Sequence, residues 1–292
     1  MKKNTIVVTG SNGQVGQELQ AIAGQYPDLK FVFTDRDTLD ISLLDGVKKY
    51  FQNIDCQYVI NAAAYTAVDK AETETALAER INTHGATNLA ETCATHHITL
   101  IHISTDYVYD KLNAPICEDA PTNPKGVYAS TKLKGDEAVL NTPNLIAAVV
   151  RTSWVYSSFG HNFLKTMLRL GKERAEMSIV FDQVGTPTYA RDLAKALVTM
   201  VQCLENGSVS TADFKGIFHY SNEGVCSWYD FATVIFSKNA YKTRLKPIRS
   251  VAFPTPAERP SYSVLDKSKI KNTFGIEIPY WTDALDACLR EL

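Results

Sequence analysis

Two residues four positions apart suggest proton-transfer chemistry in this sequence. Tyr128 and Lys132 occur in Tyr-Ala-Ser-Thr-Lys, at the start of a stretch with helical character. Side chains at this spacing share one face of a helix, so the phenol and the ammonium are expected to be neighbours. A phenol has a pKa of about 10, and an adjacent positive charge lowers that pKa by favouring the phenolate. The pair predicts acid–base catalysis, although Tyr-x-x-x-Lys alone is also typical of an exposed helix face.

Hydroxyl groups precede this pair at the end of an apolar run. Thr105 lies in Ser-Thr-Asp, 23 residues before Tyr128. At the carboxyl end of a strand, its hydroxyl would hydrogen-bond a substrate carbonyl and polarise it. The alternative is ordinary turn chemistry, for which Ser, Thr and Asp are common. In combination with Tyr128 and Lys132, Thr105 is expected to be catalytic.

A glycine-rich turn near the N-terminus predicts a dinucleotide site. Gly10, Gly13 and Gly16 fit G-x-x-G-x-x-G, between an apolar run and a helical pattern. Glycines let backbone N–H groups approach a pyrophosphate, whose charge the helix N-terminus favours. Asp35 follows Gly16 by 19 residues, after a second apolar run, where a carboxylate would bind a ribose. Its neighbour Arg36 would instead neutralise a 2′-phosphate, so both NADH and NADPH are expected to bind.

The elements that must position these residues alternate between strand and helix in the first half of the chain. Apolar, β-branched runs predict strands, and the amphipathic stretches between them predict helices. Strands are expected at 6–9, 31–34, 58–60, 100–103 and 146–150, and helices at 15–22, 43–51, 76–96 and from 128 onward. This alternation predicts an α/β fold, a Rossmann-type doubly wound parallel sheet covered by helices on both faces.

The rhythm changes after about residue 155. Helical patterns at 162–171, 190–204, 228–239 and 282–292 are separated by short strands and proline-bearing loops. We expect a cofactor-binding Rossmann domain at 1–155, which contains the Tyr/Lys pair. We expect a smaller α/β substrate lobe at 156–292, from which some segments return to the first domain.

Composition excludes several classes of function. The 292 residues include 30 Lys+Arg and 32 Asp+Glu, and this net charge of −2 gives no general attraction to nucleic acid or an anionic membrane. No apolar run reaches the roughly 18 residues of a membrane span, and no secretory signal is expected. The six scattered cysteines include no C-x-x-C pair, so they predict free thiols in a cytoplasmic protein.

Longer motifs carry a family resemblance that covers nearly the whole chain. They are residues 61–72, 104–109, 128–137, 151–156, 162–163, 182–188 and 259–260. In these stretches the chain resembles the extended short-chain dehydrogenase/reductase superfamily and, within it, the dTDP-4-dehydrorhamnose reductase family. The resemblance implies hydride transfer from NADPH or NADH to C4 of the nucleotide sugar dTDP-4-dehydro-L-rhamnose. Tyr128 would protonate the C4 oxygen, and Lys132 would hold the nicotinamide ribose and lower the tyrosine pKa.

The resemblance also implies binding residues. Asp106 and Trp154 match positions that contact the sugar in that family. An aromatic face suits the apolar side of a sugar, although Trp154 would also suit a hydrophobic core. Arg259 is expected to pair with a nucleotide phosphate or to form a surface ion pair. Beyond the glycine turn, the matched cofactor positions are Gln14, Val15, Asp40, Ile41, Ala63, Ala64 and Tyr65.

Some members of that family are homodimers with carboxylate-bound magnesium at the interface. Glu18 matches one ligand, but Tyr189-Ala-Arg-Asp192 preserves the other cluster only in part, so Mg²⁺ is not predicted. His102 is expected to pack rather than react, and Asp69, Lys70 and Glu72 are consistent with a solvated charged stretch.

Two other activities fit the same motifs. One is a reductase or epimerase of another nucleotide-activated deoxysugar, and the other is a non-catalytic NAD(P)-binding regulatory subunit. Thr105, Tyr128 and Lys132 favour an enzyme, because a binding module needs no proton donor.

Overall fold

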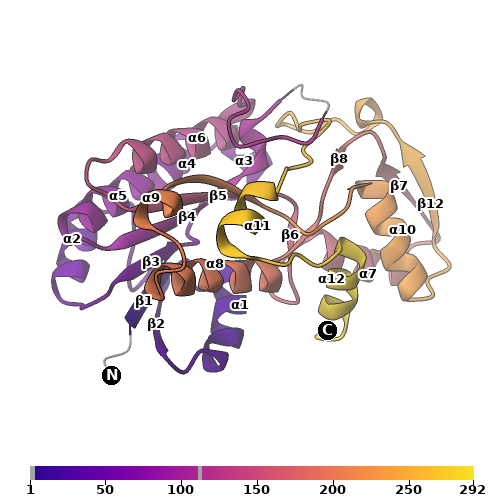
Figure 1. Cartoon of the computed structure of the whole chain (residues 1–292). Helices are drawn as coiled ribbons and strands as arrows, with labels where there is room; N and C mark the ends of the chain where they lie inside the picture. Colours follow the sequence, from indigo (N-terminus) through magenta and orange to yellow (C-terminus); the bar gives the residue numbers. More distant parts are fainter. Residues whose placement is uncertain (1–3, 111–113) are drawn as a thin grey trace.

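A six-stranded sheet forms the centre of the protein (Figure 1), whose computed structural model describes residues 4–110 and 114–292. The strand order is β2-β1-β3-β4-β5-β10, and all neighbouring strands are parallel. The strands are β1 (Asn4–Thr9), β2 (Leu29–Thr34), β3 (Tyr58–Asn61), β4 (Thr99–Thr105), β5 (Ala147–Thr152) and β10 (Gly216–Tyr220). The order changes direction between β1 and β3, which places a ligand crevice at the carboxyl ends of those strands.

Helices cover both faces of this sheet, as Figure 1 shows. One face carries α2 (Leu44–Gln52), α5 (Gly85–Thr95) and α6 (Gly126–Asn141), and the other carries α1 (Gln14–Ile22), α8 (Ala190–Glu205) and α11 (Ser268–Phe274). Side chains alternate along β1, so this strand contributes to the hydrophobic core on each face of the sheet. Ile6 and Val8 pack on the α1 side, and Val7 packs on the α2 side. The predicted doubly wound α/β class is confirmed.

The second lobe lies beyond the carboxyl ends of the strands. Its core lies between α7 (Phe163–Glu173), α10 (Trp228–Lys238) and α12 (Trp281–Leu289), beside the parallel pair β7 (Glu176–Val180) and β12 (Arg244–Ile248). Two short pairs complete the strands: β6 (Val155–Tyr156) with β9 (Thr188–Tyr189), and β8 (Val184–Gly185) with β11 (Cys226–Ser227). The remaining short helices are α3 (Val68–Ala71), α4 (Thr75–Glu79), α9 (Thr211–Phe214) and the single turns η1 (Ala23–Gln25), η3 (Asp106–Val108) and η4 (Ser250–Ala252).

Two features add detail to the sequence pattern. The helix expected at 76–96 is interrupted by a π-helical turn, η2 (Arg80–His84), a local irregularity that often accompanies functional sites. Three later segments, α8, β10 and α11, join the Rossmann sheet and its covering layer. The core of the Rossmann half therefore includes segments that lie after residue 155 in the chain.

Candidate active site

The turn between β1 and α1 has no room for side chains at its glycines. Gly10 has φ +68°, and a Cβ there would lie 2.6 Å from the backbone nitrogen of Ala63. A Cβ on Gly16 would lie 2.5 Å from the carbonyl oxygen of Gly10. The chain therefore closes tightly before α1, and a helix N-terminus reached through such a turn is suited to binding a pyrophosphate.

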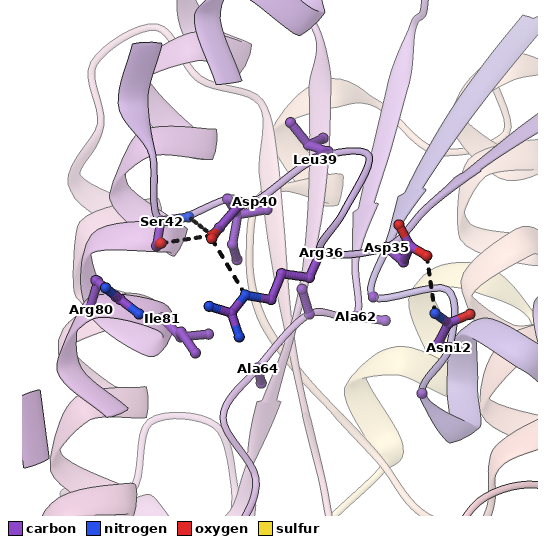
Figure 2. A pocket seen from close by; sticks show the side chains of 14 residues that line it. Asn12, Asp35, Arg36, Leu39, Asp40, Ser42, Ala62, Ala64, Arg80 and Ile81 are labelled. Carbon is purple, nitrogen blue, oxygen red and sulfur yellow. Dashed lines mark hydrogen bonds and ion pairs between the residues drawn. The ribbon is translucent and has the colours of Figure 1, made fainter. Parts of the chain in front are cut away.

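A cavity beside this turn, which we call the outer cavity, collects residues from four separate segments (Figure 2). Arg36 and Arg80 face the same space, and the Arg36 guanidinium lies 3.6 Å from the Asp40 carboxylate. Asp35 turns toward the glycine loop instead, where its carboxylate accepts a 3.1 Å hydrogen bond from Asn12. The predicted residues that line this cavity are Gly10, Gly13, Asp35, Arg36, Asp40, Ile41, Ala63 and Ala64.

The outer cavity fits the adenosine end of a dinucleotide. Asp35 offers a carboxylate for ribose hydroxyls, and its pKa is lowered chiefly by hydrogen bonds from Thr38, so it is ionised at neutral pH. Arg36 and Arg80 offer positive charge for a phosphate. Arg80 has no motif signal in the sequence, and the π-helical turn η2 brings it to the site.

A second space, the inner cavity, continues from the same turn and has a volume of about 580 Å³. Both cavities are lined by Asn12, Gly13, Ala62 and Ala64, so they form one groove. The predicted residues that line the inner cavity are Gly13, Gln14, Val15, Ala64, Thr105, Asp106, Tyr128, Lys132 and Trp154. The residues predicted for proton transfer, those predicted to contact the sugar, and the glycine turn therefore share one groove.

The start of α6 brings Tyr128 to this groove. The Glu72 carboxylate accepts a 2.8 Å hydrogen bond from the backbone N–H of Val127, which satisfies a free donor in the first turn of the helix. Gly126, at φ +76°, makes the tight entry into the helix. Glu72 therefore does more than form part of a solvated surface, because it fixes the helix end that carries the phenol.

The electrostatics of Tyr128 differ from the expectation. Burial raises the pKa of Tyr128 to about 12, while a hydrogen bond with Thr105 acts in the opposite direction. Lys132 does not lower this pKa here, because its ammonium points to the Ile103 carbonyl oxygen, 2.7 Å away, instead of toward the phenol. The phenol is therefore protonated at neutral pH and available as a proton donor.

Asp106 is a buried acid that lines the inner cavity. Its Oδ1 accepts a 3.2 Å hydrogen bond from Thr105, whereas its Oδ2 has no hydrogen-bond partner among the described residues. Burial raises the pKa of Asp106 to about 7, and the hydrogen bond from Thr105 opposes this rise. An orphaned acceptor in the inner cavity suits a sugar hydroxyl.

Trp154 does not face this cavity alone. Its indole is stacked on that of Trp228, with ring centroids 3.7 Å apart and planes 11° apart. Trp228 lies at the start of α10, where a Ser227/Asp230 capping box fixes the first turn. Sequence reasoning missed Trp228, and its only signal was an aromatic residue in the first turn of a predicted helix.

Arg259 lies further out, in a third space that we call the lobe cavity. Its guanidinium pairs with both carboxylate oxygens of Asp69, at 3.1 and 2.8 Å. The lobe cavity has a volume of about 470 Å³, and Trp228 lines both it and the inner cavity. Of its two expected roles, Arg259 therefore has the ion pair, and it also lines the lobe cavity.

Two predicted cofactor residues do not line either part of the groove as the structure describes it. Gly16 lies behind the turn, where its role is the close approach to Gly10. The Tyr65 hydroxyl donates to Glu74 at 2.7 Å, and the backbone of Tyr65 is held at both its N–H and its carbonyl by the Asn82 amide.

The residues around Glu18 do not fit a magnesium ion. Glu18 is fully buried, and its carboxylate accepts hydrogen bonds from Ser157 at 2.6 Å and Arg191 at 2.7 Å. The Arg191 guanidinium also binds Glu291 at 2.8 Å, so an internal cation already lies between the two carboxylates. Residues 4–110 and 114–292 contain no cluster of three or more His, Cys, Asp or Glu with metal-binding geometry.

Comparison with known proteins agrees with this site. The family model described as the RmlD substrate binding domain matches residues 4–292. A dTDP-4-dehydrorhamnose reductase from Sinorhizobium fredii is 39% identical over 285 residues, with 96% of this chain and 94% of that protein covered. The chain belongs to the dTDP-4-dehydrorhamnose reductase family. The resemblance predicted from the motifs is thereby confirmed.

Solved structures of family members have the same fold. The dTDP-4-dehydrorhamnose reductase of Bacillus anthracis, determined in complex with NADP, is 35% identical with a TM-score of 0.92, and both chains are covered in full. The Clostridium acetobutylicum dTDP-4-dehydrorhamnose reductase is 38% identical with a TM-score of 0.90, over 98% of this chain and 99% of that one.

In the described part of the present family member, no helix combines the length and apolarity needed to cross a bilayer.

Proposed function

We propose that this chain reduces the C4 carbonyl of dTDP-4-dehydro-L-rhamnose to the alcohol of dTDP-L-rhamnose, with NADPH or NADH as reductant. The observation that carries the proposal is that Thr105, Tyr128 and Lys132 line a cavity continuous with the glycine turn. Relatives named for this reaction support the substrate, and the NADP complex of one of them supports the cofactor.

The proton comes from Tyr128 in this mechanism. A bound nicotinamide cofactor supplies the hydride that forms the new C4–H bond. As the C4–O π bond breaks, the oxygen takes the phenolic proton of Tyr128, whose raised pKa keeps that proton in place until it is needed. Thr105 hydrogen-bonds the phenolate that remains until solvent returns a proton, and the ammonium of Lys132 would hold the nicotinamide ribose.

The substrate would span two cavities. The inner cavity presents the Trp154/Trp228 pair and the free Oδ2 of Asp106, which suit the apolar and hydroxyl faces of a sugar. The lobe cavity offers apolar walls for the nucleotide, and Arg259 borders it as a cation for the diphosphate.

The deciding experiment supplies an enzymatically generated dTDP-4-keto sugar and follows the loss of NADPH or NADH absorbance, with product identification by mass spectrometry and NMR. Formation of dTDP-L-rhamnose is expected. Tight cofactor binding without turnover of any 4-keto nucleotide sugar would instead support a regulatory subunit, and turnover restricted to a different deoxysugar would reassign the substrate.

The proposal includes a homodimer in the cytoplasm. The family resemblance supports the dimer, and light scattering of the purified protein tests it. The six cysteines, which all lie in the described part of the chain, are free, and this supports a reducing compartment.

A further inference from the structure

A series of buried polar groups connects α6 to β10, and the mechanism above does not use it. Asp136 lies one helical turn after Lys132 and is fully buried. Its Oδ2 accepts a 3.0 Å hydrogen bond from Nε of Arg151. Nη1 of Arg151 donates to the hydroxyl of Tyr109 at 2.7 Å, and this hydroxyl lies 2.8 Å from Nε2 of His219.

The hydrogens in this series have a single consistent arrangement. The Tyr109 hydroxyl accepts from Arg151, so its own hydrogen goes to Nε2 of His219. Nδ1 of His219 then donates to the carbonyl of Ile116 at 2.9 Å. Burial lowers the pKa of His219 to about 3, so the ring is neutral at neutral pH. The series is a fixed brace and not a proton path, because Arg151 does not release its proton.

The surroundings of Lys132 determine what this brace does. The Asn61 side-chain oxygen accepts from the backbone N–H of Ala63 at 3.1 Å, so the Asn61 amide nitrogen is the group that donates to Nδ1 of His102, at 2.9 Å. The neutral His102 ring therefore carries its hydrogen on Nε2, which lies 3.3 Å from Nζ of Lys132. Two N–H groups do not hydrogen-bond, so the Ile103 carbonyl is the close acceptor of the ammonium.

One acceptor is weak support for a buried ammonium. Burial lowers the pKa of Lys132 to about 8, and attraction to Asp136 is the effect that opposes this. Asp136 in turn faces Arg151 from β5, and Ser104 and His102 from β4, with its Oδ1 3.8 Å from Nε2 of His102. Burial raises the pKa of Asp136, attraction to Arg151 and Lys132 opposes this rise, and the Arg151 guanidinium fixes the position of the carboxylate.

We propose that Asp136 is a positioning residue for Lys132: its buried carboxylate is the counter-charge that keeps the ammonium protonated in the groove, and Arg151, Tyr109 and His219 hold that carboxylate in place. The inference rests on the proposed function only in that Lys132 acts there as a cation. The charge of Lys132 itself is measurable without turnover.

The first test is Asp136→Asn in the full-length, cofactor-free protein, labelled with ¹³C and ¹⁵N at lysine. A Lys132→Arg sample assigns the Lys132 resonance. The pKa of Lys132 is expected near 8 in the wild type and lower by about one unit or more in Asp136→Asn, the scale of losing a nearby opposite charge. An unchanged Lys132 pKa overturns the proposal, whether or not the protein turns over a 4-keto sugar.

The second readout is the pH dependence of kcat/KM. Activity that needs charged Lys132 declines as pH rises through its pKa, so Asp136→Asn should move this decline to lower pH. Glu137→Gln is the matched control, because it removes one negative charge at the next, exposed position of the same helix and should leave the profile unchanged. An equal loss of kcat/KM at every pH in Asp136→Asn indicates a merely structural role and overturns the proposal.

Wild-type protein provides an independent arm if Asp136→Asn does not fold. The ¹³Cγ resonance of Asp136 reports its ionisation directly. An ionised carboxylate at neutral pH agrees with the proposal. A protonated Asp136 overturns it, because a neutral carboxylic acid supplies no counter-charge.

Discussion

Trp154 and Trp228, from the two halves of the chain, stack face to face with ring centroids 3.7 Å apart. Trp154 adopts φ +47°, an unfavourable backbone conformation for a large side chain, to reach this position. Both indoles line the inner cavity. The pair joins the Rossmann half of the groove to the second lobe.

Replacing Trp228 should weaken substrate binding selectively. Trp228→Ala removes the partner that holds Trp154 flat, and the expected result is a rise in KM for the nucleotide sugar of about tenfold, the scale of one aromatic contact. Steady-state kinetics and cofactor titration measure the two effects separately. The sugar KM of Trp228→Phe, which keeps a ring in place, should lie between the values of the wild type and Trp228→Ala. A normal sugar KM in Trp228→Ala would remove the stacked pair from the substrate site.

Removing the phenolic hydroxyl should affect the chemical step. Tyr128→Phe is expected to lower kcat by roughly a hundredfold or more, as for loss of a general acid, with the cofactor Kd unchanged. Single-turnover kinetics with the 4-keto sugar check this. Tyr26→Phe makes the same change near the amino end of β2, beside Phe31, and should be neutral. Normal turnover in Tyr128→Phe contradicts the assignment of the proton donor.

Asp106 should make the stability of the protein depend on pH. Its folded-state pKa of about 7 lies above the unfolded value, so the folded state holds the proton more tightly and loses stability as pH rises toward 7. Asp106→Asn removes the cost of burying that charge, so thermal denaturation should show a gain at about pH 8 that falls to roughly a third at about pH 5.

The exposed control for that experiment is Asp28→Asn, which should shift the melting temperature little at either pH. Equal shifts at both pH values in Asp106→Asn would mean that the carboxyl group is not perturbed as described.

Because the Arg191 guanidinium lies between Glu18 and Glu291, the thermal stability of the protein should not depend on magnesium. Chelation by EDTA or addition of Mg²⁺ is expected to leave the melting temperature unchanged. Arg191→Ala leaves Glu18 buried without its cation and should lower the free energy of unfolding by about 3 kcal/mol. Arg169→Ala removes an exposed ion pair with Glu173 and should change it by about 0.5 kcal/mol or less. A clear destabilisation by EDTA would show that a metal is bound after all.

Local signals predicted most of the Rossmann half. Gly10, Gly13 and Asp35 belong to one short strand–turn–helix–strand unit, so their roles follow from neighbouring residues. Tyr128 and Lys132 share a helix face because of their spacing alone. Ile6-Val7-Val8 in β1 and Leu100-Ile101 in β4 are consecutive apolar residues buried on both faces of the sheet, a pattern typical of central parallel strands.

Local sequence signals could not predict the raised pKa of Tyr128. Spacing places Lys132 one turn away, but the direction of its ammonium depends on the Ile103 carbonyl, on His102 and on Asp136. His102, expected only to pack, belongs to this polar network. These groups come from β4 and α6, and their mutual geometry exists only once the helix is packed on the sheet.

By itself, the sequence determined the fold class and the family, and it predicted the glycine turn and the Tyr128/Lys132 pair as site residues, because each is encoded in contiguous residues or in periodicity. Tertiary structure alone decided that Trp228 meets Trp154, that Arg259 pairs with Asp69 across 190 positions, and that Arg191 occupies the space between Glu18 and Glu291. The physical reason is that a charge or ring takes its partner from whatever packing places within a few ångströms, and no local pattern records that distance.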